Sequence, residues 1–289
     1  VGIIYGVPIA ISVKWFPDRK GLAVGLTLGG FGISPLITAP IIKYLIDSAG
    51  PMSTFFYLGI VFLILLIILS LPYNFPPEDW KPEVFIPKSF SGNISAIEEL
   101  DRNEMIKKSS FWALWLSYSI GCFAGLMAIG ISVPAGIEIG LSTGMSELAV
   151  SLYAIFNFLG RPVFGVLTDK IKPKNAITLS FFLIGIASML IYVVREKIIF
   201  IIGFCLLWFN LGGWLAIAPT TTRIFYGTKY YGKNYGLVFT AYGFGAIMGI
   251  LISGQIKDLT DSYFPIFPFV AGCSLCGIII ANLFLKEKK

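Results

Sequence analysis

Two stretches that lie 215 residues apart decide the fold: GLAVGLTLGGFGISPLITAPI at residues 21–41 and GLVFTAYGFGAIMGILISGQI at residues 236–256. Both begin with Gly-Leu, are rich in glycine and end in the pattern Leu-Ile-x-x-x-Ile. After a slip of one residue, Lys43 and Asp47 match Lys257 and Asp261. Each copy is long enough for an apolar helix with a charged end. Because the two copies match in sequence, the chain contains an internal repeat of a helical unit.

The composition places these helices in lipid. Of the 289 residues, 56% are hydrophobic and only 13% are charged, and the mean hydropathy is +0.82. Soluble domains carry about 25% charged residues, which they need to cover their surface with polar groups. We therefore exclude a soluble enzyme core and a nucleic-acid-binding domain, although the formal net charge is +6.

The chain lacks the residues of common catalytic and metal sites. It has no histidine, and its four cysteines all lie inside apolar runs: Cys122, Cys205, Cys273 and Cys276. The Cys273-x-x-Cys276 pair has no second pair of ligands, so we expect these cysteines to be small packing residues. We expect no catalytic residue, no metal and no cofactor, and we do not expect an enzyme.

Apolar runs of membrane-spanning length determine the architecture. The first run, residues 1–13, rises only about 20 Å, which is short of the roughly 30 Å hydrocarbon core. We therefore expect the chain to begin inside a helix. Eight longer runs follow, at about residues 21–46, 52–72, 110–133, 146–167, 176–194, 198–222, 235–256 and 264–285. Because lipid allows no open sheet edge, we predict an all-α membrane protein with nine transmembrane helices.

The connection between the runs at 52–72 and 110–133 is the longest one. Residues 73–109 contain four prolines and many charged residues, as is typical of a linker between two halves. If this linker is cytoplasmic, 17 Lys and Arg residues fall on the cytoplasmic side and four on the other. This positive-inside asymmetry predicts a multi-pass plasma-membrane protein whose central loop and C-terminus are both cytoplasmic.

The repeat also predicts how many helices belong together. Six helices start before the second copy when the first copy itself is counted. The unit therefore has six helices in parallel orientation, and a twelve-helix parent follows. We therefore expect residues 1–72 to be the remainder of an N-terminal half, with about helices 4–6. Residues 73–109 would be the central loop, and residues 110–289 would form a C-terminal half with helices 7–12. Two six-helix halves related by an axis along the membrane normal resemble the fold of major facilitator transporters.

A local motif supports that resemblance. The stretch GRPVFGVLTDK at residues 160–170 is similar to the G-R-P-x-x-G-x-x-x-D-K/R signature that these transporters carry between the second and third helices of a half. The resemblance assigns a gate to six residues: Gly160, Arg161, Pro162, Gly165, Asp169 and Lys170. We expect Asp169 to lie near the start of the eleventh helix of the parent, where free backbone N–H groups favour a negative charge.

A second motif narrows the family. WFPDRKGLAVGL at residues 15–26, followed by Gly29-Gly30-Phe31-Gly32, resembles the oxalate/formate antiporter and monocarboxylate transporter group. That resemblance implies a facilitator or symporter of small carboxylates, with an arginine in the eighth helix as the anion anchor. Arg161 occupies this position.

Arg161 also stands out by its own chemistry. It lies eight residues before Asp169, about 12 Å into the membrane, where a charge costs roughly 2.5–3.5 kcal/mol. Tyr153, Asn157 and Arg161 follow at intervals of four and form one polar stripe on an apolar helix. The guanidinium group suits a carboxylate because it donates two parallel hydrogen bonds. The alternative is structural pairing of Arg161 with the gate or with a backbone carbonyl.

Four other side chains inside apolar runs are candidates for lining a central cavity: Tyr118, Asn210, Trp214 and Tyr242. Each has an alternative role in interhelical hydrogen bonding or in an interfacial aromatic belt. Two positions depart from the family pattern. Tyr242 stands where oxalate-type members carry lysine, which favours one carboxylate over two. Asn157 stands where proton-coupled members carry aspartate. We expect Glu138 and Glu147, which flank the loop on the side opposite the cytoplasm, to be solvated.

Together these observations predict a secondary transporter of small organic anions, of the monocarboxylate or oxalate/formate kind, that works by alternating access. Two alternatives remain open. One is a transporter of a neutral or cationic solute such as a sugar or drug, and the other is a non-transporting membrane receptor. The expected partners are the anion, a coupling ion or exchanged anion, and the lipid bilayer. We expect a monomer that does not bind nucleic acid.

Overall fold

The structure is all-helical. The computed structural model describes residues 6–17, 20–77, 80 and 99–285. The described residues form nine helices: α1 (Gly6–Trp15), α2 (Lys20–Ser70), α3 (Arg102–Ile106), α4 (Ser109–Glu138), α5 (Thr143–Ile171), α6 (Pro173–Val194), α7 (Lys197–Tyr226), α8 (Tyr231–Thr260) and α9 (Ile266–Phe284).

Several of these helices are long and apolar enough to cross a bilayer. Six stretches within the described residues meet that criterion, and they lie in α2, α4, α6, α7, α8 and α9. The protein is therefore a multi-pass membrane protein, as its composition predicts. The described part of α1 has 10 residues, too few to span a membrane, and the 29-residue α5 is not among the six. The count of nine spans stays a prediction.

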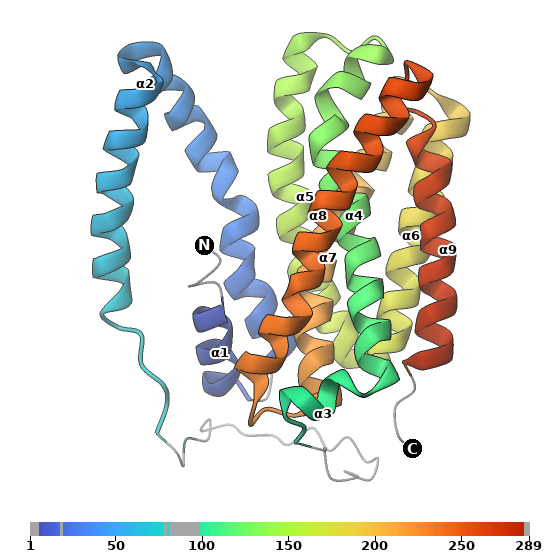
Figure 1. Ribbon diagram of the computed structural model, residues 1–289. Helices are drawn as coiled ribbons and strands as arrows, with labels where there is room; N and C mark the ends of the chain where they lie inside the picture. Colours follow the sequence, from blue (N-terminus) through green and yellow to red (C-terminus); the bar gives the residue numbers. More distant parts are fainter. Residues whose placement is uncertain (1–5, 18–19, 78–79, 81–98, 286–289) are drawn as a thin grey trace.

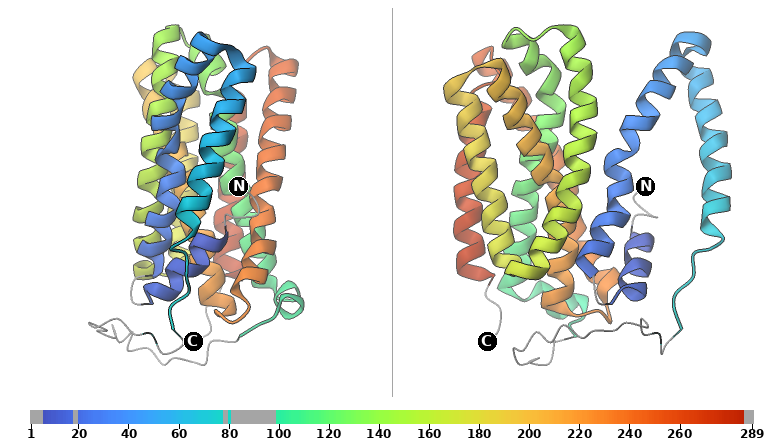
Figure 2. Two further views of the ribbon diagram at one scale, coloured as in Figure 1. Left: turned by 90° about the vertical axis from the view of Figure 1, so that its left-hand side faces the viewer. Right: turned by 180° about the vertical axis from the view of Figure 1, so that it is seen from behind.

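Helix α2 contains a sharp bend between two arms. Gly50 has a φ of 79°, a left-handed conformation that favours glycine, and Pro51 follows it. The bend separates the apolar runs expected at 21–46 and 52–72. Helices α4–α9 form a bundle, the first arm of α2 packs along α5, and the second arm stands apart (Figures 1 and 2). Phe55 and Leu63 on the second arm are 77% and 60% exposed.

The turns α5–α6 and α7–α8, the segment before α4 and the end of α9 lie at one end of the bundle, here called the connector end (Figure 1). Two hydrogen bonds fasten the segment after α2 to the end of α1. Trp15 Nε1 donates to the Asn74 carbonyl at 2.9 Å, and Trp80 Nε1 donates to the Trp15 carbonyl at 3.2 Å. Asp18 and Arg19, which continue the motif at Trp15, lie outside the described residues.

Helix α3 is a short element that the apolar pattern did not predict. Asp101 and Glu104 form a capping box at its start. The residues before it are held by the α7–α8 turn. Lys229 N donates to Glu99 Oε2 at 2.8 Å, and Asn234 Nδ2 donates to the Leu100 carbonyl at 2.9 Å. The end of the linker is therefore fixed to the start of α8.

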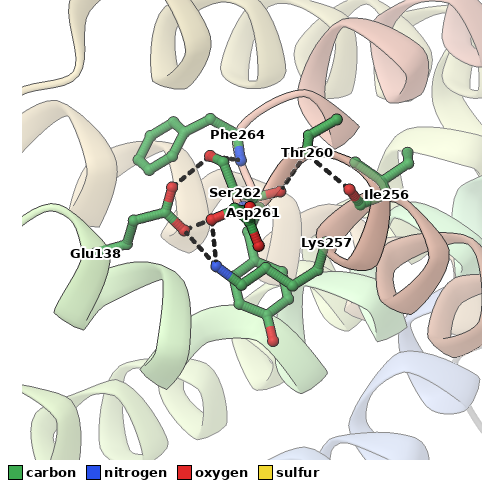
Figure 3. A network of polar contacts seen from close by, with 8 residues as sticks. Glu138, Ile256, Lys257, Thr260, Asp261, Ser262 and Phe264 are labelled. Carbon is green, nitrogen blue, oxygen red and sulfur yellow. Dashed lines mark hydrogen bonds and ion pairs between the residues drawn. The ribbon is translucent and has the colours of Figure 1, made fainter.

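A polar network closes the opposite end of the bundle (Figure 3). Glu138, at the end of α4, accepts hydrogen bonds from the Ser262 hydroxyl and, at 3.0 Å, from Tyr263 N. Lys257 Nζ lies 4.0 Å from Glu138 Oε2 and donates to the Asp261 carbonyl. Glu138 is exposed, as expected, and the α8–α9 turn, which folds onto the end of α4, also offers it two donors.

Candidate functional site

The polar stripe of α5 is buried within the helical assembly. Asn157 is fully buried and Arg161 is 4% exposed. Arg161 Nη2 donates to Asn157 Oδ1 at 2.8 Å, as their spacing of one helical turn allows. Within the described residues, Arg161 is the one charged side chain among the buried residues. A charge at this depth requires polar surroundings, which marks the stripe as the leading candidate site.

Glycines bring α7 against the stripe. A Cβ on Gly212 would clash with the Asn157 backbone, and a Cβ on Gly160 would clash with the Phe209 carbonyl. These contacts place the backbones of α5 and α7 in direct contact at the level of Asn157. Gly160 of the expected gate is therefore a packing residue between two helices.

Glycines also bring α2 against the neighbouring face of α5. A Cβ on Gly25 would lie 2.8 Å from both the Arg161 carbonyl oxygen and Pro162 Cα. A Cβ on Gly29 would lie 2.7 Å from the Phe158 ring. Because residues 157 and 160 face α7 whereas 158 and 162 face α2, Arg161 lies at the seam where α2, α5 and α7 meet. This seam joins the N-terminal part of the chain to the bundle α4–α9.

The seam offers hydrogen-bond donors. Tyr153, one turn before Asn157, lies within electrostatic range of Arg161 and packs edge-on against Trp208 of α7, with ring centroids 5.9 Å apart. Asn157 Nδ2 and Trp208 Nε1 are buried and have no acceptor in the part of the chain that the structure describes. Trp208 was not predicted from the sequence as a site residue. Its only signal was an indole N–H inside an apolar run.

Two of the expected cavity residues instead lie in the core of the bundle. Asn210 Oδ1 accepts from the Ser180 hydroxyl of α6 at 2.8 Å, and Asn210 Nδ2 donates to the Leu206 carbonyl at 2.8 Å. Trp214 lies 5.1 Å from Phe181 of α6, measured between ring centroids. This geometry favours the alternative role in interhelical packing for both residues.

The two expected tyrosines belong to aromatic clusters. Tyr118 of α4 is fully buried, stacks on Trp214 at 6.1 Å and approaches Phe239 of α8 at 6.4 Å. Tyr242 stacks on Phe239 with a centroid distance of 5.3 Å. Tyr242 thus lies in α8 and Tyr118 next to it, and their described ring contacts are with these clusters and not with the α5 stripe.

The remaining gate residues lie toward the connector end of α5. Asp169 Oδ1 lies 3.3 Å from Arg223 Nη2 in the last turn of α7. Gly165 is buried and Lys170 is exposed. We expected Asp169 near the start of α8, and its described ion pair is with Arg223 at the end of α7, one short turn before that start. Tyr231, the first residue of α8, lies within electrostatic range of Arg223. Arg223 thus links Asp169 to α8, and its position at the end of an apolar run was the available signal.

The arrangement suits recognition of a negatively charged, acceptor-rich group. The seam combines one guanidinium group with an amide N–H and an indole N–H, all donors. The described residues include no group of three or more Cys, Asp or Glu side chains that could hold a metal ion. A carboxylate has only acceptor atoms when ionised, so it complements these donors.

Comparison with known proteins gives consistent matches along the sequence. A family model described as Major Facilitator Superfamily matches residues 1–250. The oxalate:formate antiporter of Oxalobacter formigenes is 29% identical over 251 residues, which cover 86% of this chain and 58% of the antiporter. Monocarboxylate transporter 12 of Homo sapiens is 24% identical over 306 residues, covering 95% of this chain and 57% of that protein. The chain thus spans less than two thirds of the length of these relatives.

The fold also matches solved structures. A crystal structure of the E. coli fucose:proton symporter FucP aligns with a TM-score of 0.66 and 14% identity, over 99% of this chain and 74% of the symporter. At this identity the likeness concerns the fold and not the substrate.

Proposed function

Since the chain belongs to the major facilitator superfamily, we propose that it takes part in secondary transport of small organic anions, with monocarboxylates as the preferred substrates. Transport would proceed by alternating access, in which the N-terminal part and the bundle α4–α9 rock against each other around the seam. A coupling ion or an exchanged anion would accompany the substrate.

The observation that carries this proposal is the buried Arg161 at the seam. Its guanidinium group stays charged at physiological pH and donates in a fork that matches a carboxylate. The neighbouring amide N–H of Asn157 and indole N–H of Trp208 would donate hydrogen bonds to the same ligand. The names of two relatives, an oxalate:formate antiporter and a monocarboxylate transporter, support a carboxylate substrate for this chain as well.

The surroundings of Arg161 favour one carboxylate over two. The described hydrogen-bond acceptor of Arg161 is a neutral amide, and Tyr242 offers no positive charge on the α8 side. A dicarboxylate would leave its second charge without a cation. Asn157 cannot take up a proton at ordinary pH, so a proton carrier at that position is not part of the proposal.

The test is uptake of labelled lactate, pyruvate, formate and oxalate by the intact protein in proteoliposomes. We expect Arg161→Ala to abolish uptake, and Arg161→Lys to weaken it because the charge remains but the planar fork is lost. Arg102→Ala, which removes an exposed arginine of α3, is the matched control and should transport normally. Normal carboxylate uptake by Arg161→Ala, with insertion verified, would favour a neutral or cationic solute instead.

A further inference from the structure

A groove lies between α6 and α9. These two helices are on the side of the bundle away from α2 (Figures 1 and 2). It is a shallow, open groove with a volume of about 450 Å³, and it is lined by Asn175, Thr178, Leu179, Phe182 and Ile278. This volume falls within the range of ligand pockets. Because α2 and the seam are on the other side, the proposed anion site does not account for the groove.

The lining changes from polar to apolar with depth. Asn175 and Thr178 lie in the first two turns of α6, nearest the connector end. Asn282 of α9 donates to Thr178 Oγ1 at 3.3 Å and so closes the polar part of the groove. Phe182, seven residues beyond Asn175 and thus about 10 Å deeper, is 56% exposed, and Leu179 is 36% exposed. The accessible surface of the groove is almost entirely apolar, and Asn175 and Thr178 mark its connector end, where their side chains hydrogen-bond to Ile171 and Asn282.

Three lysines precede the first lining residue of the groove along the chain. Lys170, Lys172 and Lys174 alternate along the turn that leads into Asn175. Asp169, the carboxylate that precedes them, is engaged by Arg223 of α7. A ligand of this groove would thus meet lysines first, then amide and hydroxyl groups, and finally hydrocarbon side chains.

We propose that the groove binds an anionic phospholipid. The phosphate would lie at Lys172 and Lys174, the glycerol esters at Asn175 and Thr178, and one acyl chain along Leu179, Phe182 and Ile278. This order of charge, hydrogen-bonding groups and hydrocarbon reproduces the order of groups in a phospholipid along the membrane normal. A zwitterionic lipid with the same acyl chains would use the wall but gain little from the lysines.

The test compares phosphatidylglycerol with phosphatidylcholine of identical acyl chains, each added to the delipidated protein in detergent. Native mass spectrometry would count bound lipids. We expect preferential binding of phosphatidylglycerol. The double variant Lys172→Gln and Lys174→Gln should lower its affinity roughly tenfold to thirtyfold, because each lysine near a membrane surface contributes roughly fivefold. Thr178→Phe, which fills the groove without changing charge, should reduce binding of both lipids.

The matched control is the double variant Lys229→Gln and Lys233→Gln, which removes the same charge at the same end but near the α7–α8 turn. It should retain nearly the affinity of the unaltered protein. Equal losses in both double variants would indicate diffuse attraction and overturn the proposal. So would equal binding of the two lipids, or unchanged binding in Thr178→Phe. Thermal unfolding of each variant would verify that it is folded.

Discussion

Arg161 and Asn157 form a hydrogen-bonded pair of polar side chains. The arginine is positive and the asparagine is neutral, so the two side chains together carry a positive charge, which suits the anion site proposed above. The glycines at positions 160 and 212 bring backbone close to this pair and leave little room for larger side chains. The identity of residue 157 should therefore control whether an external carboxylate can bind.

Asn157→Asp tests this control. The introduced carboxylate would pair with Arg161 and compete with the substrate, so we expect strongly reduced carboxylate uptake at neutral pH. Lowering the pH would protonate the introduced group and release the guanidinium group. Uptake should then recover partly as the pH falls, whereas the unaltered protein should not show this recovery.

The control for this variant is Asn157→Gln, which keeps the amide but lengthens the side chain. It should impair uptake to the same degree at every pH, because its side chain does not titrate. A pH-dependent recovery in Asn157→Gln, or full activity of Asn157→Asp at neutral pH, would contradict the assignment of Arg161 as the anion anchor.

At the scale of helices, the sequence predicted where the helices lie along the chain better than which side of each helix packs against a neighbour. Long apolar runs are a local property, and Gly50 followed by Pro51 is a local break, so the helices and the bend could be predicted. Which side of a helix meets which neighbour depends on tertiary packing. For this reason the inward orientation of Asn210 and the pairing of Asp169 with Arg223 were not predictable. The short α3 carries no apolar periodicity, only a capping box.

The contact between α2 and α5 should depend on the missing side chain at Gly25. Because a Cβ there would meet α5 backbone at 2.8 Å, Gly25→Ala should push the helices apart and destabilise the protein by about 1–3 kcal/mol. Gly30→Ala on the same helix is the control, since a Cβ there meets nothing within 4 Å. Thermal unfolding in detergent measures both. Equal melting temperatures of the two variants would argue against this packing.

The ion pair between Asp169 of α5 and Arg223 of α7 should matter more for the rate of the transport cycle than for the stability of the fold. The side chains of Arg223 and Asp169 are 19% and 32% exposed, so solvent screens their attraction to about 0–1 kcal/mol. We expect Asp169→Asn to leave the melting temperature nearly unchanged and substrate affinity intact, but to slow transport.

Exchanging the two charges, in Asp169→Arg with Arg223→Asp, should restore part of the transport rate, because the pair is re-formed in reverse. Lys170→Gln, an exposed neighbour outside the described pair, should have little effect. Weakened substrate binding in Asp169→Asn with an unchanged turnover rate would show that Asp169 does not act as a gate residue.

At the scale of the whole molecule, the repeat and the charge asymmetry agree. The first arm of α2 and helix α8, which contain the two copies of the repeat, both run from the connector end toward the opposite end (Figure 1). This shared direction is what a parallel repeat requires. The basic turns that gather at the connector end include Lys107, Lys172 and Lys233, whereas Arg195 and Lys197 are at the other end. This distribution supports the proposal that the connector end faces the cytoplasm.

That orientation gives the last prediction. Lys233 and Lys197 are exposed and lie at opposite ends of the bundle. We expect a cysteine introduced by Lys197→Cys to react with a membrane-impermeant maleimide in intact cells, and one introduced by Lys233→Cys to react only after permeabilisation. The protein without either substitution measures background from its own cysteines, of which Cys122 and Cys205 are buried. The reverse labelling pattern would show that the connector end faces away from the cytoplasm. The Asp169–Arg223 pair would then act on the other side of the membrane.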